Sequence, residues 1–320
     1  MPAYPTIASE CLEEYCRRLK RRGLMPGTVI GYRRDIERLM RIVETVGNST
    51  HPAKITERDI DLMLTTLRKD GLKPQTMQLY IHSLRGYLRY YGNATLDQMD
   101  LLWPPADART VDWLSPHDAQ LLLDAPKTPL QELVIHMELC LGLRRIEVLR
   151  LRPDSFRGRD TIMVQGKGRG GAQWRPLPYH PDTSRVLNRY LGYRMDIIAR
   201  YKRLRPTAAI PSELLIYAVY PGTKQMRVAA YGLKGTGIDK AVLVPLRQQT
   251  GLQFSHHTLR RTFARTLWLY GSKIETIGAL LGHHSTEVTL RYIGVQHSDM
   301  TEALSGLFPR QPEGERKEVI

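Results

Sequence analysis

One stretch near the end of the chain reads Ser255-His256-His257-Thr258-Leu259-Arg260-Arg261-Thr262-Phe263. Leu259 and Phe263 stand four residues apart, which predicts one apolar face of a helix. His257 and Arg260, three residues apart, fall on a different face of that helix. At a helix start, where backbone amides and the helix dipole favour negative charge, such a pair suits an anion. Taken alone, the pair has a plainer interpretation as a capping histidine and a surface arginine.

Two further pieces follow this stretch. They read Leu281-Gly282-His283-His284 and Thr289-Leu290-Arg291-Tyr292-Ile293. We expect Gly282 to end one helix and Ser285 to cap the next, which places Tyr292 two turns into it. The plain alternatives are a histidine-containing turn and a half-buried aromatic. The local charge is basic and no H-E-x-x-H pattern stands nearby, so we expect neither a metal nor a cofactor here.

Upstream, residues 142–147 read Gly-Leu-Arg-Arg-Ile-Glu. The glycine is expected to end an apolar helix over 130–141, so that Arg144 stands at the start of a new helix and can reach a phosphate. Glu147, three residues later, can hold that guanidinium in place. The alternative is a surface ion pair that contributes little to stability.

A β-hairpin is predicted between this helix and the long helical region that begins near residue 184. Its strands cover 160–164 and 173–177, and its loop reads Gly-Lys-Gly-Arg-Gly-Gly over 166–171. Lys167 therefore lies near the tip of a flexible loop, either as a further cation for the site or as an ordinary basic turn. A nucleotide-binding P-loop is excluded, because no G-x-x-x-x-G-K-[ST] pattern is present.

The charge balance favours a polyanionic partner. Lys and Arg number 47 against 32 Asp and Glu, a formal net charge of +15. Such an excess draws a protein to nucleic acid, although it also serves simply to prevent aggregation. Hydrophobic residues make up 42% of the chain, no apolar run reaches membrane-spanning length, and the amino terminus lacks the layout of a secretory signal. With three unpaired cysteines, Cys11, Cys16 and Cys140, we expect a cytoplasmic protein.

The first part of the chain predicts a small helical bundle. Residues 8–92 show helical periodicity, with four apolar stripes and stop signals at Gly23 and Gly47. Thr56 is expected to cap the third helix with Asp59. A turn-rich connector covers 93–112, Ser115 begins the next helix, and a less regular stretch covers 205–236. The domains we predict are an amino-terminal helical domain (1–100), a linker (101–112), a second domain (113–308) and a polar tail (309–320).

Together these motifs resemble those of the tyrosine recombinase (phage integrase) family. Five pieces occur in the family's order: G-L-R-x-x-E, a G-K-G hairpin, H-x-L-R, L-G-H, and T-x-x-Y nine residues after the last histidine. The resemblance implies a mainly α fold of the two-domain, Xer-like type. It has a SAM-like four-helix core-binding bundle and an α+β DNA breaking-rejoining catalytic domain with a small β-hairpin or sheet.

The resemblance also implies a catalytic set. It makes Arg144 and Arg260 the phosphate-clamping arginines, Glu147 their acidic companion, Lys167 the hairpin lysine, His257 and His283 the two histidines, and Tyr292 the nucleophile. His256 and His284 receive no role, and Arg145 is left as structural. The implied reaction is attack of Tyr292 on a DNA phosphodiester, giving a 3′-phosphotyrosine link, with Lys167 protonating the departing 5′-oxygen. Neither ATP nor a metal is required.

The implied partner is a double-stranded DNA recombination site. Four protomers are expected to exchange strands between two duplexes through a Holliday junction, for integration and excision or for dimer resolution, in association with the nucleoid. Residues 298–308 form an amphipathic candidate for the contact between subunits, or for packing on their own domain. Two rival functions remain: relaxation of one duplex by a type IB topoisomerase, and binding of DNA junctions without cleavage.

Overall fold

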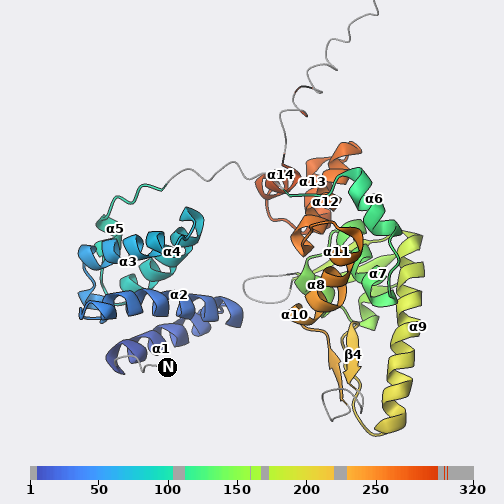
Figure 1. Ribbon diagram of the computed structural model, residues 1–320, viewed down its shortest axis with the longest axis horizontal. Helices are drawn as coiled ribbons and strands as arrows, with labels where there is room; N and C mark the ends of the chain where they lie inside the picture. Colours follow the sequence, from blue (N-terminus) through green and yellow to red (C-terminus); the bar gives the residue numbers. More distant parts are fainter. Residues whose placement is uncertain are drawn as a thin grey trace, which may run out of the picture. The chain divides into compact units, whose positions relative to one another are not determined.

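The computed structural model describes residues 6–103, 112–158, 160–166, 173–219, 229–294, 299 and 301. Figure 1 shows these residues in two compact units, which divide near residue 110. The predicted linker over 101–112 and the other domain limits stay predictions. In the part of the chain that is described, no helix combines the length and apolar character needed to cross a bilayer.

The amino-terminal unit is the predicted helical bundle. Its elements are α1 (Thr6–Arg21), α2 (Pro26–Thr45), the 3₁₀ turn η1 (Pro52–Lys54), α3 (Glu57–Lys69), α4 (Pro74–Tyr90) and the short α5 (Thr95–Gln98). The apolar stripes of the four long helices meet in one core, in which Ile36, Leu67 and Tyr87 are fully buried. Thr56 and Asp59 form the expected capping box at the start of α3, which leaves fewer unpaired amides at that end.

The carboxy-terminal unit begins with helices around a small sheet. Its first elements are α6 (Pro116–Asp124), α7 (Pro129–Ile135), the π-helical turn η2 (His136–Cys140), α8 (Arg145–Arg150) and the 3₁₀ turn η3 (Pro153–Ser155). They are followed by β1 (Phe156–Arg157), β2 (Thr161–Gln165), β3 (Trp174–Pro178) and α9 (Pro181–Leu204). The three strands are antiparallel in the order β1-β2-β3, with Met163 opposite Pro176. The predicted hairpin is therefore present, displaced by one residue, and β1 extends it to three strands.

The remaining elements bring the last three motifs together. They are β4 (Ile216–Val219), β5 (Ala229–Gly232), α10 (Gly235–Ile238), the π-helical turn η4 (Asp239–Leu243), α11 (Val244–Thr250), α12 (His256–Leu269), α13 (Ile274–Leu281) and α14 (Thr286–Ile293). A small apolar cluster of Ala264, Ile277, Leu281 and Ile293 joins α12, α13 and α14, which lie side by side in Figure 1. The antiparallel pair β4–β5 corrects the expectation of an irregular stretch over 205–236. That region lacks the apolar–polar alternation by which strands are recognised.

Gly142 fixes the approach of α12 to the start of α8. Its φ is +64°, and a Cβ there would stand 2.3 Å from the Phe263 ring of α12. Only glycine fits both the left-handed backbone and this close contact. The residue predicted to end a helix therefore also lets α12 pack against the loop that carries Arg144.

Candidate active site

Glu147 is the centre of a buried ionic cluster at the start of α8. Its side chain is fully buried and accepts hydrogen bonds from Arg144 Nη1 at 2.8 Å and from the Arg144 backbone N–H at 2.9 Å. Arg175 donates to both carboxylate oxygens, at 3.0 and 3.1 Å. Arg260 Nη1 lies 3.6 Å from the same carboxylate. Three guanidinium groups thus surround one carboxylate, and positive charge remains in excess.

Hydrogen bonding keeps Glu147 ionised despite its burial. Burial opposes ionisation, but hydrogen bonds from Arg175 and from the Arg144 amide, with the charges of Arg175 and Arg260, lower the pKa of Glu147. The carboxylate is therefore a permanent anion at neutral pH. It orients the arginines and prevents their mutual repulsion from pushing them apart.

Arg260 is fully buried on α12 and held by backbone carbonyls. It donates to Gly142 O at 2.5 Å and to Leu281 O at 2.6 Å. Burial and the neighbouring charge of Arg144 lower the pKa of Arg260 to about 9, so it stays a cation at neutral pH. A buried cation in excess of its counter-charge favours an incoming anion such as a phosphate.

His283 connects Arg260 with Tyr292. Arg260 Nη2 lies 3.2 Å from His283 Nε2, and His283 Nδ1 lies 3.0 Å from Thr289 Oγ1. Because a guanidinium only donates, Nε2 must accept, which puts the ring proton on Nδ1 towards Thr289. Burial and the charges of Arg260 and Arg144 lower the pKa of His283 to about 3. The ring is therefore neutral in any ordinary buffer.

Tyr292 lies against this group from within the same chain. Its ring is half-buried, with its centroid 4.8 Å from that of His283. The guanidinium carbons of Arg260 and Arg261 lie 5.8 and 5.6 Å from the Tyr292 centroid. Within the described residues, the Tyr292 hydroxyl has no hydrogen-bond partner. The ring thus packs beside cations on one side and against the apolar cluster of α12, α13 and α14 on another, while its hydroxyl is left without a partner among the described residues.

His257 stands at the exposed first turn of α12, where Ser255 caps the helix through the Thr258 amide at 3.1 Å. Partial desolvation and the charges of Arg261 and Arg260 lower the pKa of His257. Its imidazole is therefore neutral near pH 7 and able to accept a proton.

Two hollows flank Arg144. One, of about 560 Å³, is lined by Arg144, Gly166, Gln173, Trp174, Arg175, Gly282, His283 and His284. The other, of about 350 Å³, is lined by Arg144, Arg145, Asp239, Leu243, Arg247, Ser255, His256, His257 and Arg260. Both are strongly basic and both open beside the Glu147 cluster. Among the described residues, their arginines and histidines suit a polyanion.

The structure brings together six of the seven residues singled out in the sequence: Arg144, Glu147, His257, Arg260, His283 and Tyr292. Lys167 lies outside the described residues. The residue before it, Gly166, lines the larger hollow, and its carbonyl accepts a hydrogen bond from Arg150 at 3.2 Å. Sequence reasoning missed Arg175, although it stands two residues before the buried Leu177 on the same face of β3. An arginine on a core-facing strand position signals a buried acidic partner.

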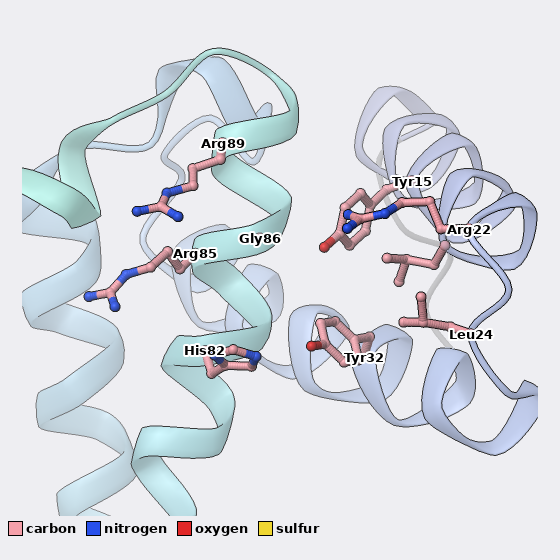
Figure 2. Close-up of a pocket in the computed structure, with 9 residues that line it drawn as sticks. Tyr15, Arg22, Leu24, Tyr32, His82, Arg85, Gly86 and Arg89 are labelled. Carbon is pink, nitrogen blue, oxygen red and sulfur yellow. The ribbon is translucent and has the colours of Figure 1, made fainter. Parts of the chain in front are cut away.

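A further hollow, of about 430 Å³, lies in the amino-terminal unit between α1, α2 and α4. Figure 2 shows Tyr15 and Tyr32 on one side of it, while Arg85 and Arg89 extend from α4 away from these tyrosines. Arg85 and Arg89 lie 3.3 and 2.6 Å from Asp97. These two arginines share the single carboxylate of Asp97, which offsets part of their charge. The cluster around Glu147 is therefore the better place for the chemistry.

Comparison with known proteins agrees with this geometry. Residues 112–299 match the phage integrase family, and residues 12–92 match the phage integrase N-terminal SAM-like domain. This chain belongs to the phage integrase family. The mainly α, two-part fold expected from the motifs is confirmed, and so is the assignment to the tyrosine recombinases.

Relatives of this phage integrase family member span nearly the whole chain. It is 26% identical to the tyrosine recombinase XerD of Listeria innocua, over 90% of this chain and 95% of that protein. It is also 26% identical to XerC of Alcanivorax borkumensis, over 90% of each. Among solved structures, the XerH recombinase bound to a palindromic difH substrate has a TM-score of 0.64 at 18% identity, covering 93% of this chain and 84% of that one. A lambda integrase dimer bound to a core site has a TM-score of 0.60 at 17% identity, covering 98% and 99%.

Proposed function

We propose that this tyrosine recombinase cleaves double-stranded DNA by attack of Tyr292 on a scissile phosphodiester. The phenolic oxygen forms a bond to phosphorus as the bond to the 5′-oxygen breaks, giving a 3′-phosphotyrosine link and a free 5′-hydroxyl. One observation carries the proposal: Tyr292 packs in its own subunit against His283 and Arg260. A guanidinium and an imidazole are groups that can bind a phosphate by charge and hydrogen bonding.

The arginine cluster supplies the electrostatic part of this proposal. A phosphorane carries more negative charge than the diester it comes from, so fixed cations stabilise the transition state more than the ground state. Arg144 and Arg260 are anchored to carbonyls and to Glu147 before DNA binds, so little reorganisation is needed when the charge develops. We assign these two arginines to the non-bridging phosphate oxygens.

Proton transfer is assigned to His257 and Lys167, with His283 as a hydrogen-bond partner. His257, with its lowered pKa, is the proposed acceptor for the Tyr292 proton. His283 presents a neutral ring to Arg260 and acts as a hydrogen-bond partner. Lys167 is the proposed acid that protonates the departing 5′-oxygen, supported by Gly166, which lines the same hollow as Arg144 and His283.

The proposed substrate is a recombination site on duplex DNA, acted on in association with the nucleoid. Support comes from the +15 net charge and from the similarity to XerH and lambda integrase, which were solved bound to DNA sites. The reverse attack by the 5′-hydroxyl of a second duplex completes strand exchange through a Holliday junction, without ATP or a metal.

Self-association to a tetramer on DNA is proposed through residues 298–308. Within this range, Asp299 is held on α12 by Arg265, at 2.5 and 2.8 Å. An apolar hollow of about 510 Å³ lies on the same unit, lined in part by the exposed Leu123, Leu269 and Tyr270. Truncation after Thr301 should abolish two-site complexes and leave single-site binding. If two-site complexes survive, the segment packs on its own subunit.

The test begins by finding the site. Covalent protein–DNA adducts are trapped in cells, the bound DNA is sequenced, and a nicked duplex of that site is incubated with purified protein. Wild type should form a denaturant-resistant adduct, and Tyr292→Phe should form none. Holliday junctions from two sites separate a recombinase from a topoisomerase. Absence of any adduct would leave a DNA-binding protein and overturn the proposal.

A further inference from the structure

His256, the neighbour of His257, is buried between two carboxylates. Its Nδ1 lies 2.8 and 2.6 Å from the two oxygens of Glu138, and its Nε2 lies 2.6 Å from Asp239 Oδ1. Glu138 is fully buried and His256 is 9% exposed. Glu138 comes from η2 and Asp239 from η4, so the ring joins three separate segments of the carboxy-terminal unit.

The geometry of this group fixes its proton count. Each short N···O contact needs one hydrogen, and a neutral imidazole carries only one. With both carboxylates ionised, the ring must be an imidazolium. The cluster therefore holds one proton more than a neutral histidine and two carboxylates would hold together. Removing that proton would place a nitrogen lone pair against a carboxylate oxygen in a buried site.

This cluster touches the elements that carry the proposed catalytic groups. Asp239 also accepts hydrogen bonds from Arg145, at 3.0 and 3.3 Å, and Arg145 follows Arg144. Glu138 lies on the π-helical turn just before Gly142, whose carbonyl holds Arg260. His256 itself is the first residue of α12. One buried ring thus ties the start of α12 to both segments that position the arginines.

Two plainer roles fit less well. A metal site requires ligands that converge on one ion, whereas the two carboxylates bind opposite nitrogens of the ring and stand on opposite sides of it. If this position served only for packing, an apolar side chain would be enough. It would also avoid burying the carboxylate of Glu138, whose free-energy cost is large unless the charge is paired. The buried carboxylate of Glu138 hydrogen-bonds the His256 ring and so fixes the orientation of that ring.

We propose that His256 is a positioning residue for DNA cleavage: held as an imidazolium between Glu138 and Asp239, it locks the first turn of α12 so that His257 and Arg260 meet the scissile phosphate. This rests on the cleavage reaction proposed above. In the cleavage step, His256 acts through its neighbours His257 and Arg260 and not on the scissile phosphate itself.

The proton in the cluster makes this lock sensitive to alkaline pH. The charged and titratable groups around it are Glu138, Asp239, Arg144, Arg145, Arg247, His257 and Arg260. Burial opposes the charge, but the hydrogen bonds and charges of Glu138 and Asp239 raise the pKa of His256. Burial also raises the pKa of Glu138, but we place the shared proton on the ring, because there it faces a carboxylate at each nitrogen. When folding raises the pKa of a group, protonation of that group stabilises the fold. The stabilisation is complete at pH values below the group's ordinary pKa, and it is lost as the pH rises through the raised pKa. The lock therefore opens on the alkaline side.

Two variants separate positioning from mere packing. His256→Leu should lower the single-turnover cleavage rate roughly 10- to 100-fold through misplacement of the α12 groups, while DNA affinity stays near wild type. His117→Leu, an exposed histidine on α6, is the matched control and should cleave normally. Glu138→Gln should cleave nearly normally at pH 7, because an amide can donate to a neutral ring and no extra proton is needed.

The decisive readout is the ratio of wild-type to Glu138→Gln cleavage rates between pH 7 and 10, in which titrations common to both proteins cancel. The ratio should fall steadily as pH rises. In parallel, imidazole ¹⁵N spectra of the free wild-type protein should show one doubly protonated ring at pH 7.5, absent from His256→Leu. The inference would be overturned if the rate ratio did not change with pH, or if His256→Leu cleaved DNA as fast as wild type. It would also be overturned if the spectra showed all ten histidine rings to be neutral at pH 7.5. Failure of wild type to form any adduct would instead overturn the proposed cleavage reaction.

Discussion

Arg175 on β3 and Glu147 on α8 form a two-pronged ion pair, with each guanidinium Nη donating to a different carboxylate oxygen at 3.0 and 3.1 Å. This pair attaches the base of the hairpin that carries Lys167 to the helix start that carries Arg144. Planar bidentate geometry is particular to arginine. The hairpin and Arg144, the proposed phosphate-binding arginine, are therefore positioned by one contact.

Replacement of Arg175 tests this link. Arg175→Lys keeps the charge but loses the second hydrogen bond, so we expect DNA cleavage to fall roughly tenfold or more through misplacement of Arg144 and the hairpin. Single-turnover cleavage of a nicked duplex measures it. Arg203→Lys, at an exposed position of α9, is the control. Equal rates for Arg175→Lys and wild type would show that charge alone suffices.

Glu147→Gln removes the anion from among three arginines. We expect a loss of about 3–5 kcal/mol in the free energy of unfolding at pH 7, the usual result of leaving buried charge uncompensated. The pKa of Glu147 is lowered in the fold, so its contribution is complete above the ordinary carboxyl value and is lost as pH falls through the lowered one. Urea unfolding therefore measures the free energy of unfolding of wild type and Glu147→Gln at pH 7 and pH 3.5. The difference between the two proteins should be smaller at pH 3.5. A difference independent of pH would contradict this.

Two glycines with the same backbone conformation separate strain from contact. Gly142→Ala meets both a φ of +64° and the Phe263 ring, whereas Gly251→Ala has a φ of +72° and nothing within 4 Å. We expect Gly251→Ala to cost about 1–2 kcal/mol from left-handed strain alone. Gly142→Ala should cost clearly more and should also slow cleavage, because Gly142 O anchors Arg260. Thermal unfolding measures the loss of stability in each variant, and cleavage assays measure the rate. Equal losses of stability in Gly142→Ala and Gly251→Ala would refute the close packing of Gly142 against Phe263.

Thr289→Val tests the tautomer of His283. The hydroxyl of the buried Thr289 faces His283 Nδ1 at 3.0 Å, and valine keeps the shape without the acceptor. We expect little change in DNA affinity and a fall in cleavage rate of roughly tenfold, since a ring free to change tautomer or turn no longer fits Arg260. Thr286→Val, exposed on the same helix, is the control. An unchanged rate would show that Arg260 orients His283 alone.

Local patterns were enough to predict much of the fold and most of the site. The spacing of His257 and Arg260 on one helix, the stop at Gly142 and the cap at Thr56 each depend on neighbours within one or two turns. The resemblance to the family then assigned seven residues from distant motifs to one expected site. The structure brings six of them together, and Lys167 lies outside the described residues.

Long-range partners were not predictable in the same way. His256 and Glu138 lie 118 residues apart, and nothing local to either shows that they meet. Arg175 reaches Glu147 only because the hairpin folds against α8. The strands β4 and β5 lack alternation, since they come from an apolar run and a small-residue stretch. In each case, tertiary packing decides what the local sequence leaves open.

The most direct measurement is mass spectrometry of the trapped adduct. A nicked duplex of the recombination site is cleaved, the complex is digested with protease and nuclease, and the modified peptide is sequenced. We expect a 3′-nucleotide phosphate on the oxygen of Tyr292, in a peptide that spans α14. A nucleotide on another residue, or a 5′-linked phosphate on Tyr292, would contradict the assignment of this phenol as the nucleophile beside Arg260 and His283.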